Sequence, residues 1–224
     1  MSEAARKLVT INNPIHVLCE GGSDKGFLEH LIEQRGLHGF DVGCPTPETS
    51  GGYGVSGFQK YLLAVETSSD RARLRGLLVV ADGDENPARR FEEIRSALAA
   101  IDCDVMQPFA PSRIESKALT LGVFLVPGRD RTGTLEHLLL DAVFEGRPEL
   151  QRCVSSFQDC LDEPGHWSDN KQAKMRLHAL IAGCCEEEPS TNLATLWSKR
   201  GNPVPLASAR FNELVETLQY FAGL

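Results

Sequence analysis

No stretch of this chain approaches the roughly 20 consecutive apolar residues that a membrane-spanning helix needs. The first seven residues, Met-Ser-Glu-Ala-Ala-Arg-Lys, are not followed by the apolar run of a secretory signal, so we expect neither a membrane anchor nor export. The chain has no Cys-x-x-Cys pair, and its seven cysteines are scattered and odd in number. Reduced thiols in a cytoplasmic protein are the simplest interpretation of this pattern.

Several catalytic motifs are also absent. The chain has no Gly-x-Ser-x-Gly motif, and segment 21–26 lacks the Lys-Ser/Thr pair of a phosphate-binding loop, which argues against a built-in ATPase. Cys184, Cys185 and His178 do not have the spacing of a zinc site. The formal net charge of −8 argues against strong non-specific binding to nucleic acid. It does not exclude a nuclease, because part of that charge would belong to a metal site and would be neutralised by cations.

Short apolar runs alternate with segments of helical spacing over the first 133 residues. The glycine-rich segment 49–57 predicts a flexible loop, and Ser23 or Asp24 is expected to cap the first helix. Strands separated by helices indicate an α/β fold with a mostly parallel sheet. We expect strands at 15–19, 40–42, 77–81 and 122–127, and helices at 25–35, 58–68 and 87–100.

From Thr134 onward the pattern is helical. We expect helices at 135–144, 149–161, 170–184 and 207–221. This divides the chain into an α/β core, 1–133, and a helical C-terminal extension, 134–224. No long linker separates the two parts, so we expect the extension to pack on the core as one compact unit.

Two acidic signatures each follow an apolar run: Glu20-Gly-Gly-Ser-Asp24 and Asp82-Gly-Asp84. The carboxyl ends of parallel strands share one edge of the sheet, where open α/β sheets bind ligands. Oxygen ligands without His or Cys favour Mg²⁺ or Mn²⁺. Taken singly, the first signature is also compatible with an ordinary turn capped by Asp24, and an Asp-Gly-Asp is a turn more often than a site. Their joint occurrence favours a metal site.

These two signatures together resemble a Toprim domain, the catalytic fold of topoisomerases, bacterial primases and the overcoming-lysogenization-defect nucleases. The resemblance is greatest to small stand-alone Toprim-like proteins, in which a Pro-initiated helix and a Gly-Thr-Leu-Glu helix start follow. Here these features are Asp84-Glu-Asn-Pro87 and Gly133-Thr-Leu-Glu136. The resemblance covers about residues 13–185 and implies an α/β Toprim-like fold.

The resemblance also implies roles for individual residues. Glu20 would be a general acid or base as well as a metal neighbour, and Asp82 and Asp84 would hold the divalent ion. Asp24 and Glu136 fall where the nuclease branch completes a two-metal site. An equally weighted alternative for Glu136 is an acid that complements the dipole of its helix. Two departures stand out: Asn86 replaces an acid of some Toprim proteins, and no region like that of a topoisomerase active-site tyrosine is evident.

Basic residues at two places are candidates for contacts with phosphate. Lys171, Lys174 and His178 recur at helical spacing, and Lys174 matches the family's catalytic lysine better than Lys171. Such a stripe is otherwise an ordinary solvated face. Lys60 and a cluster before the third strand are expected to contact a nucleic-acid backbone or, alternatively, to serve as surface charges; the cluster comprises Arg71, Arg73 and Arg75.

The sequence therefore predicts a Toprim-type nuclease that hydrolyses phosphodiester bonds of DNA or RNA with Mg or Mn. The alternative is a non-catalytic Toprim module that binds a nucleotide, nucleic acid or a separate ATPase protein, and the acidic net charge favours it. The two hypotheses differ in the site expected. A nuclease requires Glu20, Asp82, Asp84 and Glu136 around a common point with a basic groove, whereas in a binding module the acids lie apart or are capped by Arg.

Overall fold

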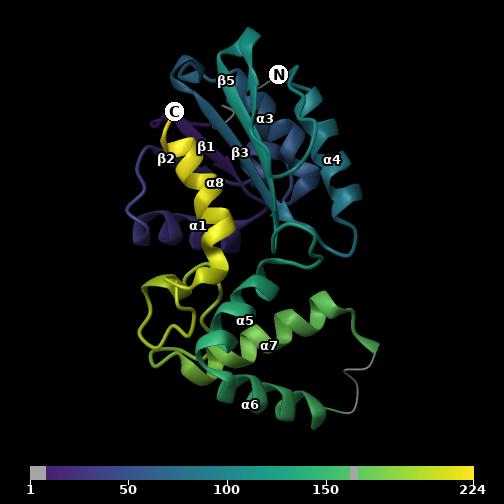
Figure 1. Ribbon diagram of the computed structural model, residues 1–224, viewed down its shortest axis with the longest axis vertical. Coiled ribbons are helices and arrows are strands. Elements are labelled where there is room, and N and C mark those ends of the chain that lie inside the picture. Colours follow the sequence, from purple (N-terminus) through teal and green to yellow (C-terminus); the bar gives the residue numbers. More distant parts are fainter. Residues whose placement is uncertain (1–8, 162–165) are drawn as a thin grey trace.

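A five-stranded sheet in the order β2-β1-β3-β5-β4 forms the centre of the N-terminal part of the chain (Figure 1). The computed structural model describes residues 9–161 and 166–224. Four strands are parallel, and the short edge strand β4 runs antiparallel to β5. The predicted α/β class with a mostly parallel sheet is confirmed. The strands are β1 Ile15–Leu18, β2 Phe40–Gly43, β3 Gly76–Asp82, β4 Ser112–Ile114 and β5 Leu119–Val126.

Helices cover both faces of the sheet because the central strands are apolar on both sides. Successive residues of β3 alternate between two core clusters, so that Leu78 and Val80 face α1 while Leu77 and Val79 face α3 and α4. The right-handed crossovers of such units place each helix beside the strand it follows. The helices of this part are α1 Gly22–Gln34, α2 Pro47–Ser50, α3 Phe58–Glu66 and α4 Pro87–Ala99.

The C-terminal part is helical, and its last helix returns to the sheet. Helices α5, α6 and α7 lie beyond one end of the sheet, whereas α8 lies along one sheet face (Figure 1). The ring of Phe221 on α8 occupies the space left by two glycines of the sheet: a Cβ built on Gly76 or Gly122 would come within 3.0 Å of that ring. The division into 1–133 and 134–224 stays a prediction. These helices are α5 Leu135–Gly146, α6 Pro148–Asp159, α7 Asp169–Cys184 and α8 Asn212–Ala222.

Several local predictions were wrong. The edge strand β4 was missed because three residues give no periodicity to read. Part of the predicted loop 49–57 is ordered as the end of α2 and a 3₁₀ turn at Val55–Gly57. Helix α1 begins at Gly22 after an N-cap at Gly21, and not after Ser23 or Asp24.

This earlier start of α1 gives Asp24 a different task from the predicted cap. At the third helical position, its carboxylate is held by backbone N–H groups of Gly21 and of Asp24 itself.

Two predictions about location are affected differently by the structure. Within the described ranges, no helix combines the length and the apolar character needed to cross a membrane. The expectation that no signal peptide is present concerns residues 1–8, which lie outside the described residues.

Candidate functional site

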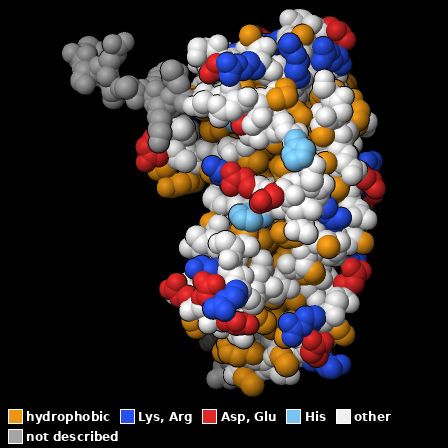
Figure 2. Space-filling model, turned by 90° about the vertical axis from the view of Figure 1, so that its left-hand side faces the viewer, with side chains coloured by type: hydrophobic (Ala, Val, Ile, Leu, Met, Phe, Trp, Pro, Cys, Tyr) orange, Lys and Arg blue, Asp and Glu red, His pale blue; other side chains and the backbone are white. Residues whose placement is uncertain are grey.

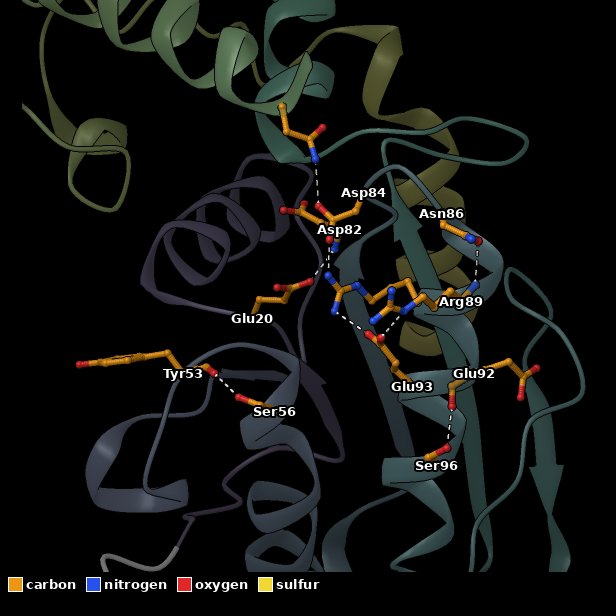
Figure 3. A network of polar contacts seen from close by, with 12 residues as sticks. Glu20, Tyr53, Ser56, Asp82, Asp84, Asn86, Arg89, Glu92, Glu93 and Ser96 are labelled. Carbon is orange, nitrogen blue, oxygen red and sulfur yellow. Dashed lines mark hydrogen bonds and ion pairs between the residues drawn. The ribbon is translucent and has the colours of Figure 1, made fainter. Parts of the chain in front are cut away.

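The acidic signatures meet at the carboxyl ends of β1 and β3 (Figure 3). The parallel register pairs Leu18 with Val79, so Glu20, two residues beyond Leu18, lies beside the end of β3. The Glu20 carboxylate accepts a hydrogen bond from the backbone N–H of Asp82, with 2.9 Å between Oε1 and N. The side chain of Glu20 is therefore fixed on the neighbouring strand, next to Asp82.

The start of α5 brings a further acid to this edge. The Asp82 carboxylate accepts a hydrogen bond from the backbone N–H of Leu135, at 2.8 Å, in the first turn of α5. The positive end of the helix dipole favours a carboxylate there. Asp84 and Gly133 exchange two backbone hydrogen bonds, each of 2.8 Å, which fasten the loops that precede α4 and α5. Glu136 follows Leu135 and is thereby carried to the same edge.

The pKa values of Glu20, Asp24 and Asp82 are all raised. Burial raises the pKa of Asp82 well above its usual range, and the neighbouring carboxylates of Glu20, Asp24 and Glu136 raise it further. Burial and the charges of Glu20 and Glu136 raise the pKa of Asp24 to about 7. Burial likewise raises the pKa of Glu20. We call Glu20, Asp24, Asp82 and Glu136 the acidic cluster.

Asp84 is not counted in the acidic cluster, because its carboxylate contacts Arg90 and Asn170 instead. Its carboxylate pairs with the guanidinium of Arg90 on α4 and accepts a hydrogen bond of 3.1 Å from Asn170 on α7. Arg90 also pairs with Glu93 at 3.0 Å. Its positive charge lowers the pKa of Glu20, against the larger effect of burial. Capping by arginine is the feature expected of the non-catalytic alternative, and it is seen here at Asp84.

The acidic cluster fits a divalent ion by charge and by donor type. Its oxygen donors suit Mg²⁺ or Mn²⁺, and a bound cation would relieve the repulsion that raises the pKa values of Asp24 and Asp82. In the part of the chain that the structure describes, however, no three His, Cys, Asp or Glu side chains are arranged to hold an ion as they stand. Ligation would require side-chain rotations, and Asp84 would have to leave Arg90.

Two lysines of α7 have different surroundings. Lys174 is exposed, and its charge lowers the pKa of Glu20, which places it within electrostatic reach of the acidic cluster. The ammonium of Lys171 lies 3.9 Å from the centre of the Trp167 ring, in a cation–π contact. His178 is exposed on the same helix.

The predicted basic cluster is at the other end of β3 from the acids. Arg71 pairs with Glu66 and Arg73 with Asp70, so these two side chains are engaged in ion pairs of the surface. The guanidinium of Arg75 donates to the carbonyl of Ala72. On the face shown in Figure 2, several Lys and Arg side chains gather near the top of the molecule with Asp and Glu side chains beside them, and lower down the two kinds are interspersed.

Sequence reasoning missed two residues that contact the site, Arg90 and Asn170. Both reach Asp84 from helices that follow it in the chain, and neither belongs to a recognisable motif. Asn86, which stands where some relatives of the predicted family have an acid, caps α4 by accepting a hydrogen bond of 3.0 Å from the backbone N–H of Arg89.

Comparison with known proteins gives one family and two structural neighbours. Residues 14–218 match the family described as "Protein of unknown function (DUF3226)". A search of curated proteins found no match. The chain is similar to the C-terminal region of the Burkholderia pseudomallei OLD protein, with 13% identity, a TM-score of 0.43, and coverage of 94% of this chain and 98% of that chain. It is also similar to the C-terminal region of the Xanthomonas campestris pv. campestris OLD protein, with 12% identity, a TM-score of 0.40, and coverage of 94% of each chain.

Proposed function

The chain belongs to the DUF3226 family, and for this member we propose metal-dependent hydrolysis of phosphodiester bonds in nucleic acid, as in a Toprim-type nuclease. The observation that carries the proposal is the acidic cluster at the carboxyl edge of the sheet, in which burial and the charges of Glu20 and Glu136 raise the pKa values of Asp24 and Asp82. Repulsion of this kind opposes folding and is expected where a cation is to be bound. The metal ligands proposed are Glu20, Asp24, Asp82 and Glu136, with Asp84 once Arg90 releases it.

In this reaction Glu20 and Lys174 would have different roles. Glu20, whose pKa is raised by burial, is suited to hold or to accept a proton at its carboxylate. Lys174 would hold a non-bridging phosphate oxygen, because its ammonium is exposed and within electrostatic reach of Glu20. A bound Mg²⁺ or Mn²⁺ would supply Lewis-acid stabilisation of the phosphate and an activated water.

A second candidate function is a non-catalytic module that binds nucleic acid, a nucleotide or a separate ATPase protein. The ion pair between Arg90 and Asp84 favours it, since an arginine there neutralises a carboxylate that a metal would otherwise use. The net charge of −8 points the same way.

One set of assays separates the two functions. Single- and double-stranded DNA and RNA are incubated with the protein and Mg²⁺ or Mn²⁺, and metal binding is followed separately by calorimetry. A nuclease should lose metal binding and cleavage together in Asp82→Ala. Lys174→Ala should keep metal binding and lower kcat by about 10²-fold, whereas Lys171→Ala, on the same helix, should leave kcat unchanged. Absence of cleavage by the wild type with either metal, or full activity of Asp82→Ala, would exclude the enzyme.

A further inference from the structure

A cavity of about 670 Å³ opens beside Glu20, on the side of α3 and α4. Its volume is within the roughly 300–1,000 Å³ that is usual for pockets that bind small molecules. Glu20, Arg90 and Glu93 form one part of its wall, and Tyr53 and Gly54 of the glycine-rich loop 51–54 form another. The cavity is thus continuous with the acidic cluster through Glu20, and the proposed chemistry makes no use of it.

The loop that carries Tyr53 is attached to Glu20 itself. The backbone N–H of Gly54 donates a hydrogen bond of 3.1 Å to the carbonyl of Glu20. Gly54 has a φ of 68°, a backbone conformation that residues other than glycine rarely adopt. On the other side of the loop, the hydroxyl of Ser56 donates to the carbonyl of Tyr53 at 3.1 Å. These bonds fix the position of Tyr53 relative to Glu20 (Figure 3).

The side chain of Tyr53 is 67% exposed, although it carries a large apolar ring. Two basic side chains lie near its loop or cavity, of which Arg90 is paired with Asp84 and with Glu93, a further residue of the cavity wall. Arg90 lines the cavity, and the ammonium of Lys60 lies next to Gly51, 3.4 Å from where a Cβ of that residue would be. An exposed aromatic ring at the rim of a cavity, with a lysine near its loop, is a feature of sites that bind single-stranded nucleic acid.

We propose that Tyr53 stacks on an unpaired base, so that the substrate of the site is single-stranded nucleic acid. In a duplex both faces of a base are covered by its neighbours, and only an unpaired or extruded base can lie on the tyrosine ring. The base would occupy the rim at Tyr53, and the adjoining phosphate would lie towards Arg90 and the acidic cluster. This inference rests on the proposed function, because it assigns the substrate of the same site.

The experiment measures binding apart from hydrolysis. Fluorescence anisotropy is recorded with a labelled single-stranded oligonucleotide, and with the duplex of the same sequence, in EDTA. Tyr53→Ala should weaken binding of the single strand by about 10-fold, a typical effect of losing one stacked base. Tyr53→Phe should bind like the wild type, because it keeps the ring. Tyr220→Ala is the matched control, since Tyr220 on α8 is 53% exposed.

The outcomes distinguish this inference from the proposed function. The stacking role would be overturned, even if the wild type cleaves, if Tyr53→Ala binds the single strand as tightly as the wild type does. It would also be overturned if the affinity of Tyr53→Ala falls by the same factor for the duplex as for the single strand, or if the wild type binds neither form. If Tyr53→Ala loses single-strand binding while the wild type cleaves nothing with either metal, Tyr53 keeps its role and the enzyme is excluded. Equal melting temperatures of the variants show that the fold is intact.

Discussion

Replacing Asp24 by Asn should stabilise the metal-free protein at alkaline pH. The substitution removes the charge but keeps an oxygen for the backbone N–H groups that hold the carboxylate. The pKa of Asp24 rises from its ordinary value of 3.8 to about 7 in the folded state. At about 1.36 kcal/mol for each pKa unit, this corresponds to an upper limit of about 4 kcal/mol. Asp24 is partly exposed, so we expect roughly 1–3 kcal/mol after solvent screening.

The sign of the pH dependence follows from the raised pKa. Near pH 4 Asp24 is protonated in the folded protein, so no free energy is lost there by burying a charged carboxylate. Between pH 4 and 7 the unfolded chain releases this proton while the folded chain retains it, so the free energy of unfolding falls as the pH rises. Asn does not titrate. The advantage of Asp24→Asn should therefore be small at pH 4 and complete at pH 8.

Urea denaturation in EDTA at pH 4 and pH 8 measures this advantage. Glu216→Gln on α8 is the control, because Glu216 is exposed and far from the cluster in the chain. Mg²⁺ should then stabilise the wild type at pH 8, by about 2.7 kcal/mol at 100 times its Kd, and should stabilise Asp24→Asn less. The reasoning is refuted if Asp24→Asn is no more stable relative to the wild type at pH 8 than at pH 4.

Three further predictions concern single side chains. Phe221→Ala should lower the free energy of unfolding by roughly 3–5 kcal/mol in urea denaturation, because its ring fills the space between α8 and the sheet; a loss below 1 kcal/mol would contradict that packing. Arg90→Gln should free Asp84 and tighten Mg²⁺ binding by about 5-fold in calorimetry, and weaker binding would show that Arg90 does not compete with the ion. A hydrogen bond from Cys19 lowers the pKa of Cys44 to about 7, so alkylation of Cys44 followed by mass spectrometry should be half-maximal near pH 7, and not above pH 8.

Much of the fold could be predicted from the sequence because strands and helices of this kind have local signals. The apolar runs that became β1, β3 and β5 are buried on both faces, a pattern that is typical of the central strands of a parallel sheet. The acids that follow two of these runs could be named for the same reason. The order of the strands in the sheet was harder to predict from the sequence, because β4 pairs with β5 through three residues only.

The sequence by itself thus determined which acids stand at strand ends, because burial patterns and turns depend on neighbours in the chain. Only the tertiary structure decided how those acids are used. Asp82 receives the N–H of Leu135 from 53 residues away, Asp84 is engaged by Arg90, and Lys174 acts on Glu20 while Lys171 lies on Trp167. Ion pairs, hydrogen bonds and shared burial depend on distances in space, which the helix and strand periods of the chain do not encode.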